Sequence, residues 1–224
     1  MIELKNIYIE DNNKKNLFKN ISLSITDGSL ISIEGNSGSG KSLFIKMLAL
    51  IKKPQKGKVS VFRRNIENLS RNEITFIQRR IGVVFQDSNL VGHLSVKDNI
   101  ILPLIIANEN KKDIENAVKE LMKWLGISSI VEESINNISW TNIKLINLAR
   151  AIINRPRIIL LDDFFSGIDA EVQEKTMHLL LALNKIGATI VITGRTPDIL
   201  YRSKYRHYLI KDGIIINKLN NKYL

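Results

Sequence analysis

The stretch Gly35-Asn36-Ser37-Gly38-Ser39-Gly40-Lys41-Ser42 decides the fold of this chain. It matches the phosphate-binding pattern G-x-x-x-x-G-K-[ST] at every required position. Residues 30–33 are typical of a short buried strand, and residues 43–50 are typical of an apolar helix. Because glycine has no Cβ, the loop between them can turn successive backbone N–H groups into one concavity that suits an anion. The order of strand, loop and helix predicts a phosphate-binding loop in an α/β core; a chance glycine-rich turn is the alternative.

The end of this loop indicates a nucleoside triphosphate with Mg²⁺ as the ligand. The helix that begins after Gly40 adds the positive end of its dipole. Lys41 brings a positive charge to the β- and γ-phosphates, and the Ser42 hydroxyl can ligate Mg²⁺. We expect all residues from Gly35 to Ser42 to contribute to binding.

A second motif supplies the carboxylates that such a site needs. Mg²⁺ is held by an acidic residue at the C-terminal end of a core strand that faces the phosphate loop. Residues 157–161 form an apolar predicted strand, and Asp162 and Asp163 follow it. We expect Asp162 to ligate Mg²⁺ and Asp163 to orient the attacking water. The alternative interpretation is a pair of aspartates that cap a loop.

Composition limits the other functions. The chain has 224 residues, enough for one sizeable α/β domain, and it has no cysteine for disulfide, zinc or thiol chemistry. No apolar run reaches the ~18–20 residues that span a bilayer, and the start shows no signal-peptide pattern, so we expect a cytoplasmic location. The formal net charge of +11 suggests nucleic acid or an anionic membrane as partner, and the alternative is a general coding bias, because Lys, Asn and Ile are abundant throughout. The basic residues form no long run with interleaved aromatics, so we expect no nucleic acid.

Periodicity predicts one α/β core interrupted by a helical lobe. Further strand patterns lie at residues 2–9, 21–25, 58–62, 81–85 and 188–193. Residues 11–16 are typical of a turn, and residues 208–216 of a closing hairpin. One face of a predicted helix in the lobe carries apolar side chains, namely Ile114, Val118, Leu121, Met122 and Leu125. We assign residues 1–88 and 152–224 to the nucleotide-binding core and residues 89–151 to the lobe, within a single domain.

The order of these motifs along the chain carries a family resemblance. After the phosphate loop come Gln86 behind an apolar strand, a segment centred on Ser139 before a helix, the Asp162 strand, and Ser-Gly-Ile-Asp at residues 166–169. This series resembles the nucleotide-binding domain of ABC ATPases over essentially the whole chain. Residues 79–87, 96–107 and 205–213 are similar to the FtsE cell-division branch of that family. Lipoprotein-release and macrolide-export ATPases share parts of these segments.

The resemblance implies a P-loop NTPase core with an antiparallel β edge, an inserted helical lobe, and a shared catalytic site. Two such domains would sandwich two ATP molecules between the phosphate loop of one chain and the Ser139 segment of the other, where Asp169 would also touch the opposing chain. Lys41, Gln86 and Asp163 would be the catalytic residues, and Ser42, Gln86 and Asp162 the Mg²⁺ ligands.

The resemblance also implies an integral membrane partner, either FtsX-like or an exporter permease. The chain would then be peripheral on the inner face of the cell membrane. The Gln86 loop and residues 91–107 would form the docking surface; a buried core role for this apolar stretch is the alternative.

Four departures from the family pattern gather around hydrolysis. Ile138-Ser139-Trp140-Thr141-Asn142 stands where the family has Leu-Ser-Gly-Gly-Gln, so the small residues that allow close backbone approach are missing. Asp163 is one methylene shorter than the water-orienting glutamate. Gly194 stands at the switch histidine, and Asp11 stands near the aromatic residue that stacks on adenine. We expect triphosphate binding to persist, hydrolysis to be impaired and slow, and the ATP-dependent homodimer to be weakened. The milder alternative is an ordinary slow ATPase.

The function expected from the sequence is that of an ATP-binding subunit in an FtsE/FtsX-like complex. Occupancy or slow hydrolysis of Mg-ATP would act on the membrane partner in cell division. The ATPase of a lipoprotein or lipid exporter, and a regulatory scaffold that binds ATP without hydrolysing it, are the alternatives. A DNA-repair ATPase comes last, because the long coiled-coil insertion usual in such proteins is missing.

Overall fold

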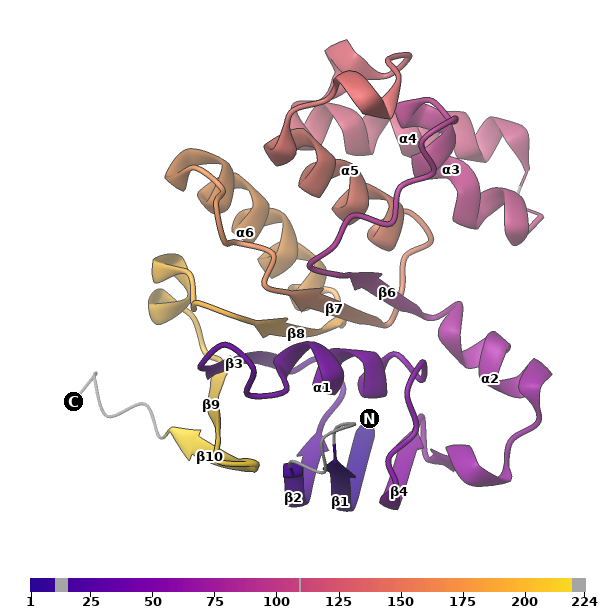
Figure 1. Cartoon of the computed structure of the whole chain (residues 1–224). Coiled ribbons are helices and arrows are strands. Elements are labelled where there is room, and N and C mark those ends of the chain that lie inside the picture. Colours follow the sequence, from indigo (N-terminus) through magenta and orange to yellow (C-terminus); the bar gives the residue numbers. More distant parts are fainter. Residues whose placement is uncertain (11–15, 109, 219–224) are drawn as a thin grey trace.

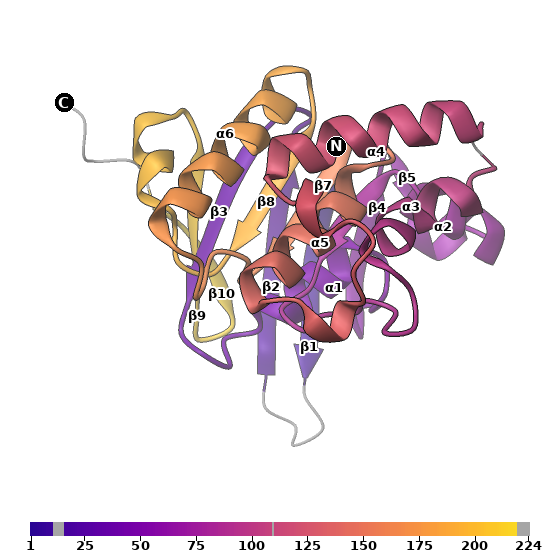
Figure 2. The same cartoon turned by 90° about the horizontal axis from the view of Figure 1, so that it is seen from above.

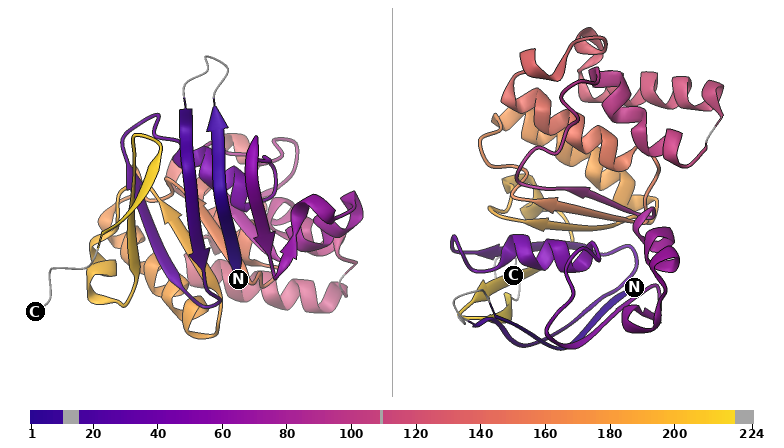
Figure 3. Two further views of the ribbon diagram at one scale, coloured as in Figure 1. Left: turned by 90° about the horizontal axis from the view of Figure 1, so that it is seen from below. Right: turned by 45° about the vertical axis from the view of Figure 1, so that its right-hand side comes forward.

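The computed structural model describes residues 1–10, 16–108 and 110–218 of the chain. Most of the predicted turn at residues 11–16, Asp11 included, lies outside these ranges. Two β-sheets lie one above the other, with helix α1 (Lys41–Leu48) between them and further helices on the outer face of the larger sheet (Figures 1 and 3). The predicted α/β class, with a mainly parallel sheet and an antiparallel β edge, is confirmed.

The larger sheet has six strands in the order β10-β9-β3-β8-β7-β6. Its strands are β3 (Leu30–Gly35), β6 (Ile81–Val84), β7 (Ile158–Asp162), β8 (Thr189–Thr193), β9 (Arg206–Lys211) and β10 (Ile214–Lys218). Only β10 runs antiparallel to its neighbour. Every residue of β7 and of β8 is buried, as expected for strands covered on both faces. The carboxyl ends of β3, β6, β7 and β8 therefore meet along one edge, beside the phosphate loop.

The smaller sheet is antiparallel and has four strands in the order β2-β1-β4-β5. These are β1 (Ile2–Glu10), β2 (Asn16–Ile25), β4 (Lys56–Val61) and β5 (Arg64–Asn65). Figure 3 shows this sheet from below, in front of the rest of the molecule. Its apolar side chains point toward α1, and a core forms in the space between the two sheets.

Helix α1 occupies the middle of that core. Phe44, Ile45, Met47 and Leu48 are buried on a helix of only eight residues. Phe18 of β2 meets Phe44 edge to face, with ring centroids 6.1 Å apart. Such complete burial holds α1 in place between the sheets and thereby holds the loop at its N-terminus.

The outer face of the larger sheet is covered by helices that share a second core (Figure 2). The helices are α3 (Val96–Ile106), α4 (Lys111–Leu125), α5 (Trp140–Ile152) and α6 (Ala170–Lys185). The chain enters α3, α4 and α5 after β6 and returns to the sheet at β7. The apolar face predicted for α4 is confirmed: Ile114, Val118 and Met122 are buried, and Leu121 and Leu125 pack against the same core.

Several elements have no counterpart in the sequence prediction. These are α2 (Arg71–Gln78), α6, β5 and the short 3-10 turns η1 (Ile66–Asn68), η2 (Ser128–Ile130), η3 (Ile135–Asn137) and η4 (Asp198–Arg202). The start of α2 carries a capping box between Ser70 and Glu73, a local signal that the sequence does contain. No helix within the described ranges is long and apolar enough to cross a membrane.

Gly82 of β6 is the point of closest approach between the larger sheet and α5. A Cβ at this position would lie 2.2 Å from the Ala151 carbonyl oxygen. Gly82→Ala should destabilise the protein by about 1–3 kcal/mol, because the helix must shift to make room. Urea unfolding measures the change. Gly92→Ala is the control, since its Cβ would meet only Asn136 Oδ1 at 3.8 Å; equal losses for the two variants would contradict the expectation.

Candidate nucleotide-binding site

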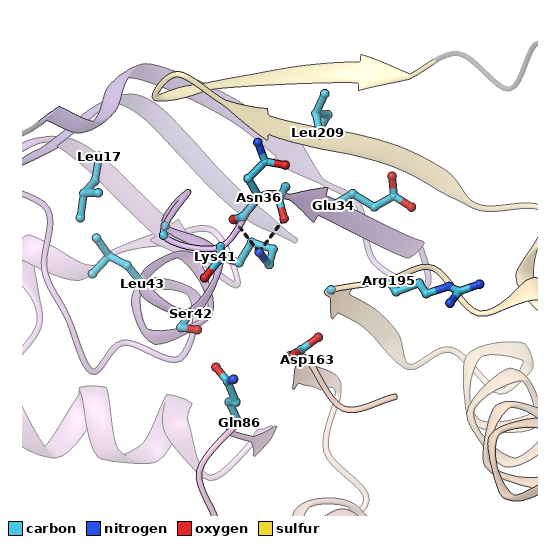
Figure 4. Close-up of a pocket in the computed structure, with 15 residues that line it drawn as sticks. Leu17, Glu34, Asn36, Lys41, Ser42, Leu43, Gln86, Asp163, Arg195 and Leu209 are labelled. Atoms are coloured by element: carbon cyan, nitrogen blue, oxygen red, sulfur yellow. Dashed lines mark hydrogen bonds between the residues drawn. The ribbon is translucent and has the colours of Figure 1, made fainter. Parts of the chain in front are cut away.

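A pocket of about 820 Å³ opens at the carboxyl edge of the larger sheet (Figure 4). This volume suits a small-molecule ligand. Its lining comes from segments far apart in the sequence: Leu17, Glu34, Gly35, Asn36, Ser37, Gly38, Gly40, Lys41, Ser42, Leu43, Gln86, Asp163, Gly194, Arg195 and Leu209. Ser39 belongs to the same loop but lines a neighbouring hollow. The pocket thus brings the predicted loop together with Gln86 and Asp163.

Two glycines of the loop leave no room for a side chain. A Cβ on Gly35 would lie 2.6 Å from Ser39 Oγ and 2.7 Å from the Ile210 carbonyl oxygen. Gly40 has a φ of 100°, and a Cβ there would lie 2.8 Å from the Phe18 ring. The backbone can therefore make this turn only with glycine at both positions.

Lys41 extends back across the loop. Its ammonium donates hydrogen bonds to the carbonyl oxygens of Gly35, at 2.7 Å, and of Asn36, at 2.9 Å (Figure 4). No side chain caps the N-terminus of α1, so the first N–H groups of the helix face the pocket beside this positive charge. Free backbone donors, a helix dipole and an ammonium together fit a polyanionic group such as a triphosphate.

The predicted Mg²⁺ ligands do not all face the pocket. Ser42 and Gln86 border the same open space as Asp163 (Figure 4). Asp162, at the end of β7, is only 2% exposed, and its Oδ1 accepts a 2.8 Å hydrogen bond from the Thr193 hydroxyl. Among the described residues no cluster of three His, Cys, Asp or Glu side chains could hold a metal alone. The Ser42 hydroxyl and the Gln86 amide at the pocket, together with the Asp162 carboxylate at the end of β7, are ligands of the kind that Mg²⁺ takes alongside phosphate and water.

Asp163 and Gly194 form a tight pair at the back of the pocket. Gly194 has a φ of 107°, and a Cβ on it would lie 2.3 Å from Asp163 Oδ1. Asp163 itself has a φ of 48°, in the left-handed region that few residues other than glycine adopt. The Asp163 carboxylate thus occupies the space that a side chain at position 194 would need, so this arrangement excludes a histidine there.

Glu34, the last residue before the loop glycine, is held by a polar network. Its two carboxylate oxygens accept hydrogen bonds from the Thr196 hydroxyl at 2.9 Å and the Lys218 ammonium at 3.1 Å. His207 Nε2 lies 3.2 Å from the same carboxylate. Burial acts to raise the pKa of Glu34, but these hydrogen bonds and the neighbouring positive charges outweigh it and lower the pKa below its ordinary value. Glu34 therefore stays negative beside the loop.

Ser139 does not line the pocket. It caps the N-terminus of α5, where its hydroxyl accepts a hydrogen bond from the Asn142 N–H at 3.3 Å. Trp140 follows it and is 52% exposed. The single chain therefore keeps the Ser139 segment apart from its own phosphate loop.

Sequence reasoning missed several pocket residues. These are Glu34, Leu17, Leu43 and Leu209. Arg195, which follows Gly194 and could supply charge there, also lines the cavity, with its guanidinium directed away from Lys41 and Ser42 (Figure 4). Glu34 and Leu43 have a sequence signal, because they directly flank the loop. Leu17 and Leu209 reach the pocket only through the packing of their strands.

The contact between Asp163 and Gly194 predicts a coupling free energy. Gly194→Ala should destabilise the protein both through its φ and through the clash with Asp163 Oδ1. In an Asp163→Ala background the clash is removed, so the loss should be smaller by about 0.5–3 kcal/mol. Urea unfolding of the four proteins in the double-mutant cycle measures this difference. Gly28→Ala, also at positive φ but with nothing within 4 Å of its Cβ, should add independently to Asp163→Ala; coupling of equal size there would contradict the interpretation.

Comparison with known proteins identifies the family. A family model described as ABC transporter matches residues 18–166. The cell division ATP-binding protein FtsE of Bacillus subtilis (strain 168) is 31% identical over 216 residues, covering 96% of this chain and 95% of the relative. FtsE of Streptococcus pneumoniae serotype 2 is 29% identical and covers 96% and 94%. The methionine import ATP-binding protein MetN 3 of Pectobacterium atrosepticum is 31% identical, but the match spans 65% of its length.

Solved structures agree with this result. A dimeric post-hydrolysis state of the ATP-binding cassette MJ0796, bound to ADP and Pi, superposes with a TM-score of 0.90 at 29% identity over 100% of both chains. A second dimeric structure of MJ0796, a bacterial ABC transporter cassette, gives a TM-score of 0.89 at 31% identity, again over 100% of both chains. Motif order, fold and pocket agree with these matches, and the chain belongs to the ABC transporter family as an ATP-binding protein.

Proposed function

We propose that this chain is the ATP-binding subunit of an FtsE/FtsX-like complex, in which Mg-ATP occupancy or slow hydrolysis acts on an integral membrane protein during cell division. The observation that carries the proposal is the convergence of the phosphate loop, Gln86 and Asp163 on one pocket. The similarity to FtsE over nearly the whole length of both chains supports the cell-division assignment.

Each side chain around the pocket has a separate proposed role in phosphoryl transfer. Lys41 and the N–H groups at the start of α1 would bind the triphosphate, and Asp163 would accept a hydrogen bond from the attacking water. Ser42, Gln86 and Asp162 would hold Mg²⁺, which when bound neutralises negative charge on the phosphate oxygens. The Thr193 hydroxyl, by its bond to Asp162, orients that carboxylate.

We propose that turnover is slow, and the same geometry supports this. The short Asp163 side chain lies against Gly194, where the family resemblance would place a histidine, so the polar side chain expected at position 194 is missing. A missing electrostatic contact of this kind costs ~10²–10³ in rate. The exposed Trp140 adds bulk beside Ser139, on the face that we propose meets a second chain. We therefore propose an ATP-dependent homodimer that is weaker than that of related cassettes.

The membrane partner would dock on the exposed end of α3. The apolar run of this helix is divided by the fold: Ile100 and Leu104 are buried, whereas Ile105 and Ile106 are 51% and 57% exposed. The core interpretation is therefore confirmed for Ile100 and Leu104, and the exposed Ile105 and Ile106 are the residues that we propose for docking. Docking there would keep the chain peripheral at the inner face of the membrane.

ATP binding should depend on Lys41. Lys41→Ala should weaken Mg-ATP binding by about 1.5–3 kcal/mol, because it removes a charge-assisted contact to the phosphates. Isothermal titration calorimetry measures the affinity. Lys46→Ala is the matched control, since Lys46 lies on the same helix with its side chain exposed; equal affinities of the two variants would contradict the assignment.

Hydrolysis should be measurable and should depend on Asp163. We expect steady-state phosphate release under saturating Mg-ATP to fall below the ~1–10 s⁻¹ of an ordinary enzyme, and Asp163→Ala to reduce it further while leaving ATP binding intact. A parent rate inside that range would contradict slow turnover. No release above the Lys41→Ala background would instead identify a scaffold that binds ATP without hydrolysing it.

Partner binding should depend on the end of α3. Ile105→Glu together with Ile106→Glu should abolish co-purification with the membrane partner, because charge replaces the exposed apolar contact. Ile186→Glu is the control, since Ile186 is 82% exposed and lies beyond α6. Retained co-purification of the double variant, with an unchanged unfolding midpoint, would place the interface elsewhere.

A further inference from the structure

Lys144 is a buried cation on α5 that the chemistry above does not use. It is 8% exposed, and its ammonium donates hydrogen bonds to the Phe164 carbonyl oxygen, at 2.8 Å, and to the Ser166 carbonyl oxygen. Both acceptors belong to the segment that directly follows Asp163. Burying a charge is costly unless its hydrogen bonds are made, so this contact fixes the segment firmly.

The same segment is held from its other side by α6. Gln173 donates hydrogen bonds to the carbonyl oxygens of Phe165, at 3.3 Å, and Ile168, at 2.7 Å. The Phe164 and Phe165 rings meet edge to face with centroids 5.0 Å apart, and both are buried. Residues 163–168 are therefore clamped between α5 and α6, which lie on the same side of β7 (Figure 1). Lys144 supplies the clamp nearest Asp163.

Lys144 also contacts the exposed start of α5. Its ammonium lies 5.6 Å from the centroid of the Trp140 ring, one helical turn away, within the range of a cation–π contact. Trp140 stands next to Ser139 on the surface. One ammonium thus touches the Ser139–Trp140 surface and the backbone that follows Asp163.

We propose that Lys144 is a positioning residue, which holds Asp163 for hydrolysis and couples that position to whatever binds the Ser139–Trp140 surface. The proposal rests on the proposed ATPase function. Its physical basis is the shared ammonium: a change at the Trp140 ring alters the position of Lys144, and the Phe164 and Ser166 carbonyls follow. Burial lowers the pKa of Lys144, although the negative charge of Asp163 opposes this.

Three lysine variants and two tryptophan variants test this coupling. Lys144→Met removes the cation and Lys144→Arg keeps a charged donor; Lys175→Met makes the same chemical change at an exposed lysine of α6. Trp140→Leu removes the ring, and Trp124→Leu is its match, because Trp124 is a 58% exposed tryptophan on α4. Amide hydrogen exchange without nucleotide measures how firmly residues 164–168 are held. Phosphate release and calorimetric ATP affinity measure the effect of each variant on hydrolysis and on binding.

For Lys144→Met we expect exchange in residues 164–168 roughly 10-fold faster, the effect of losing a charge-assisted hydrogen bond. We also expect kcat to fall roughly 10- to 100-fold with unchanged ATP affinity, since a small displacement of Asp163 suffices. Lys144→Arg should restore part of the exchange protection and part of kcat. Trp140→Leu should speed exchange in residues 164–168, and Trp124→Leu should not.

Unchanged exchange in both Lys144→Met and Trp140→Leu would overturn the proposal, as would a loss of ATP affinity equal to the loss of kcat. If Lys144→Met does not fold, exchange in the surface variant Trp140→Leu decides alone. A parent without phosphate release would contradict the proposed hydrolysis, while the exchange experiment would still test whether Lys144 and Trp140 hold residues 164–168.

Discussion

The absence of space beside Gly35 and Gly40 is the constraint on which the rest of the structure depends. The chain leaves the larger sheet at Gly35 and must turn directly into α1, between the Ile210 carbonyl and the Phe18 ring. This turn directs α1 into the space between the two sheets, where its apolar side chains form the centre of one core. The same turn directs the Lys41 side chain back across the loop. The turn therefore determines both the packing of α1 and the position of the ammonium that we expect to bind phosphate.

Helix α5 connects the two loops that carry the remaining catalytic candidates. Lys144 holds the segment after Asp163, while Arg150 donates to the Asn89 carbonyl oxygen and to Asn147 Oδ1 near the segment after Gln86. Burial lowers the pKa of Arg150. Lys144 donates to two backbone carbonyl oxygens, whereas Arg150 donates to one backbone carbonyl oxygen and one side-chain oxygen. One helix therefore sets the position of both loops relative to the sheet.

Local patterns were predictable from the sequence, and long-range contacts were not. The phosphate loop, the Asp162 strand and the face of α4 depend on spacing within a few residues, which the sequence displays. Glu34 instead acquires its partners Thr196 and Lys218 from segments 162 and 184 residues away. Position 194 was interpreted as the loss of a side chain, whereas the structure shows that the Asp163 carboxylate fills the same space. The sequence cannot show that one side chain fills the space of another, because positions 163 and 194 become neighbours only when the ends of β7 and β8 lie side by side.

The backbones of β6 and α5 approach closely at one place, where Gly82 faces the Ala151 carbonyl oxygen. The helix is fixed to the sheet at this C-terminal end, because no side chain separates the two backbones. Its 13 residues span roughly 20 Å, and the far end carries Trp140 at the surface. By geometry alone, a tilt of about 5° around the Gly82 contact would move this end by roughly 2 Å. The α5 end that carries Trp140 therefore lies far from the point where the helix backbone meets the sheet at Gly82.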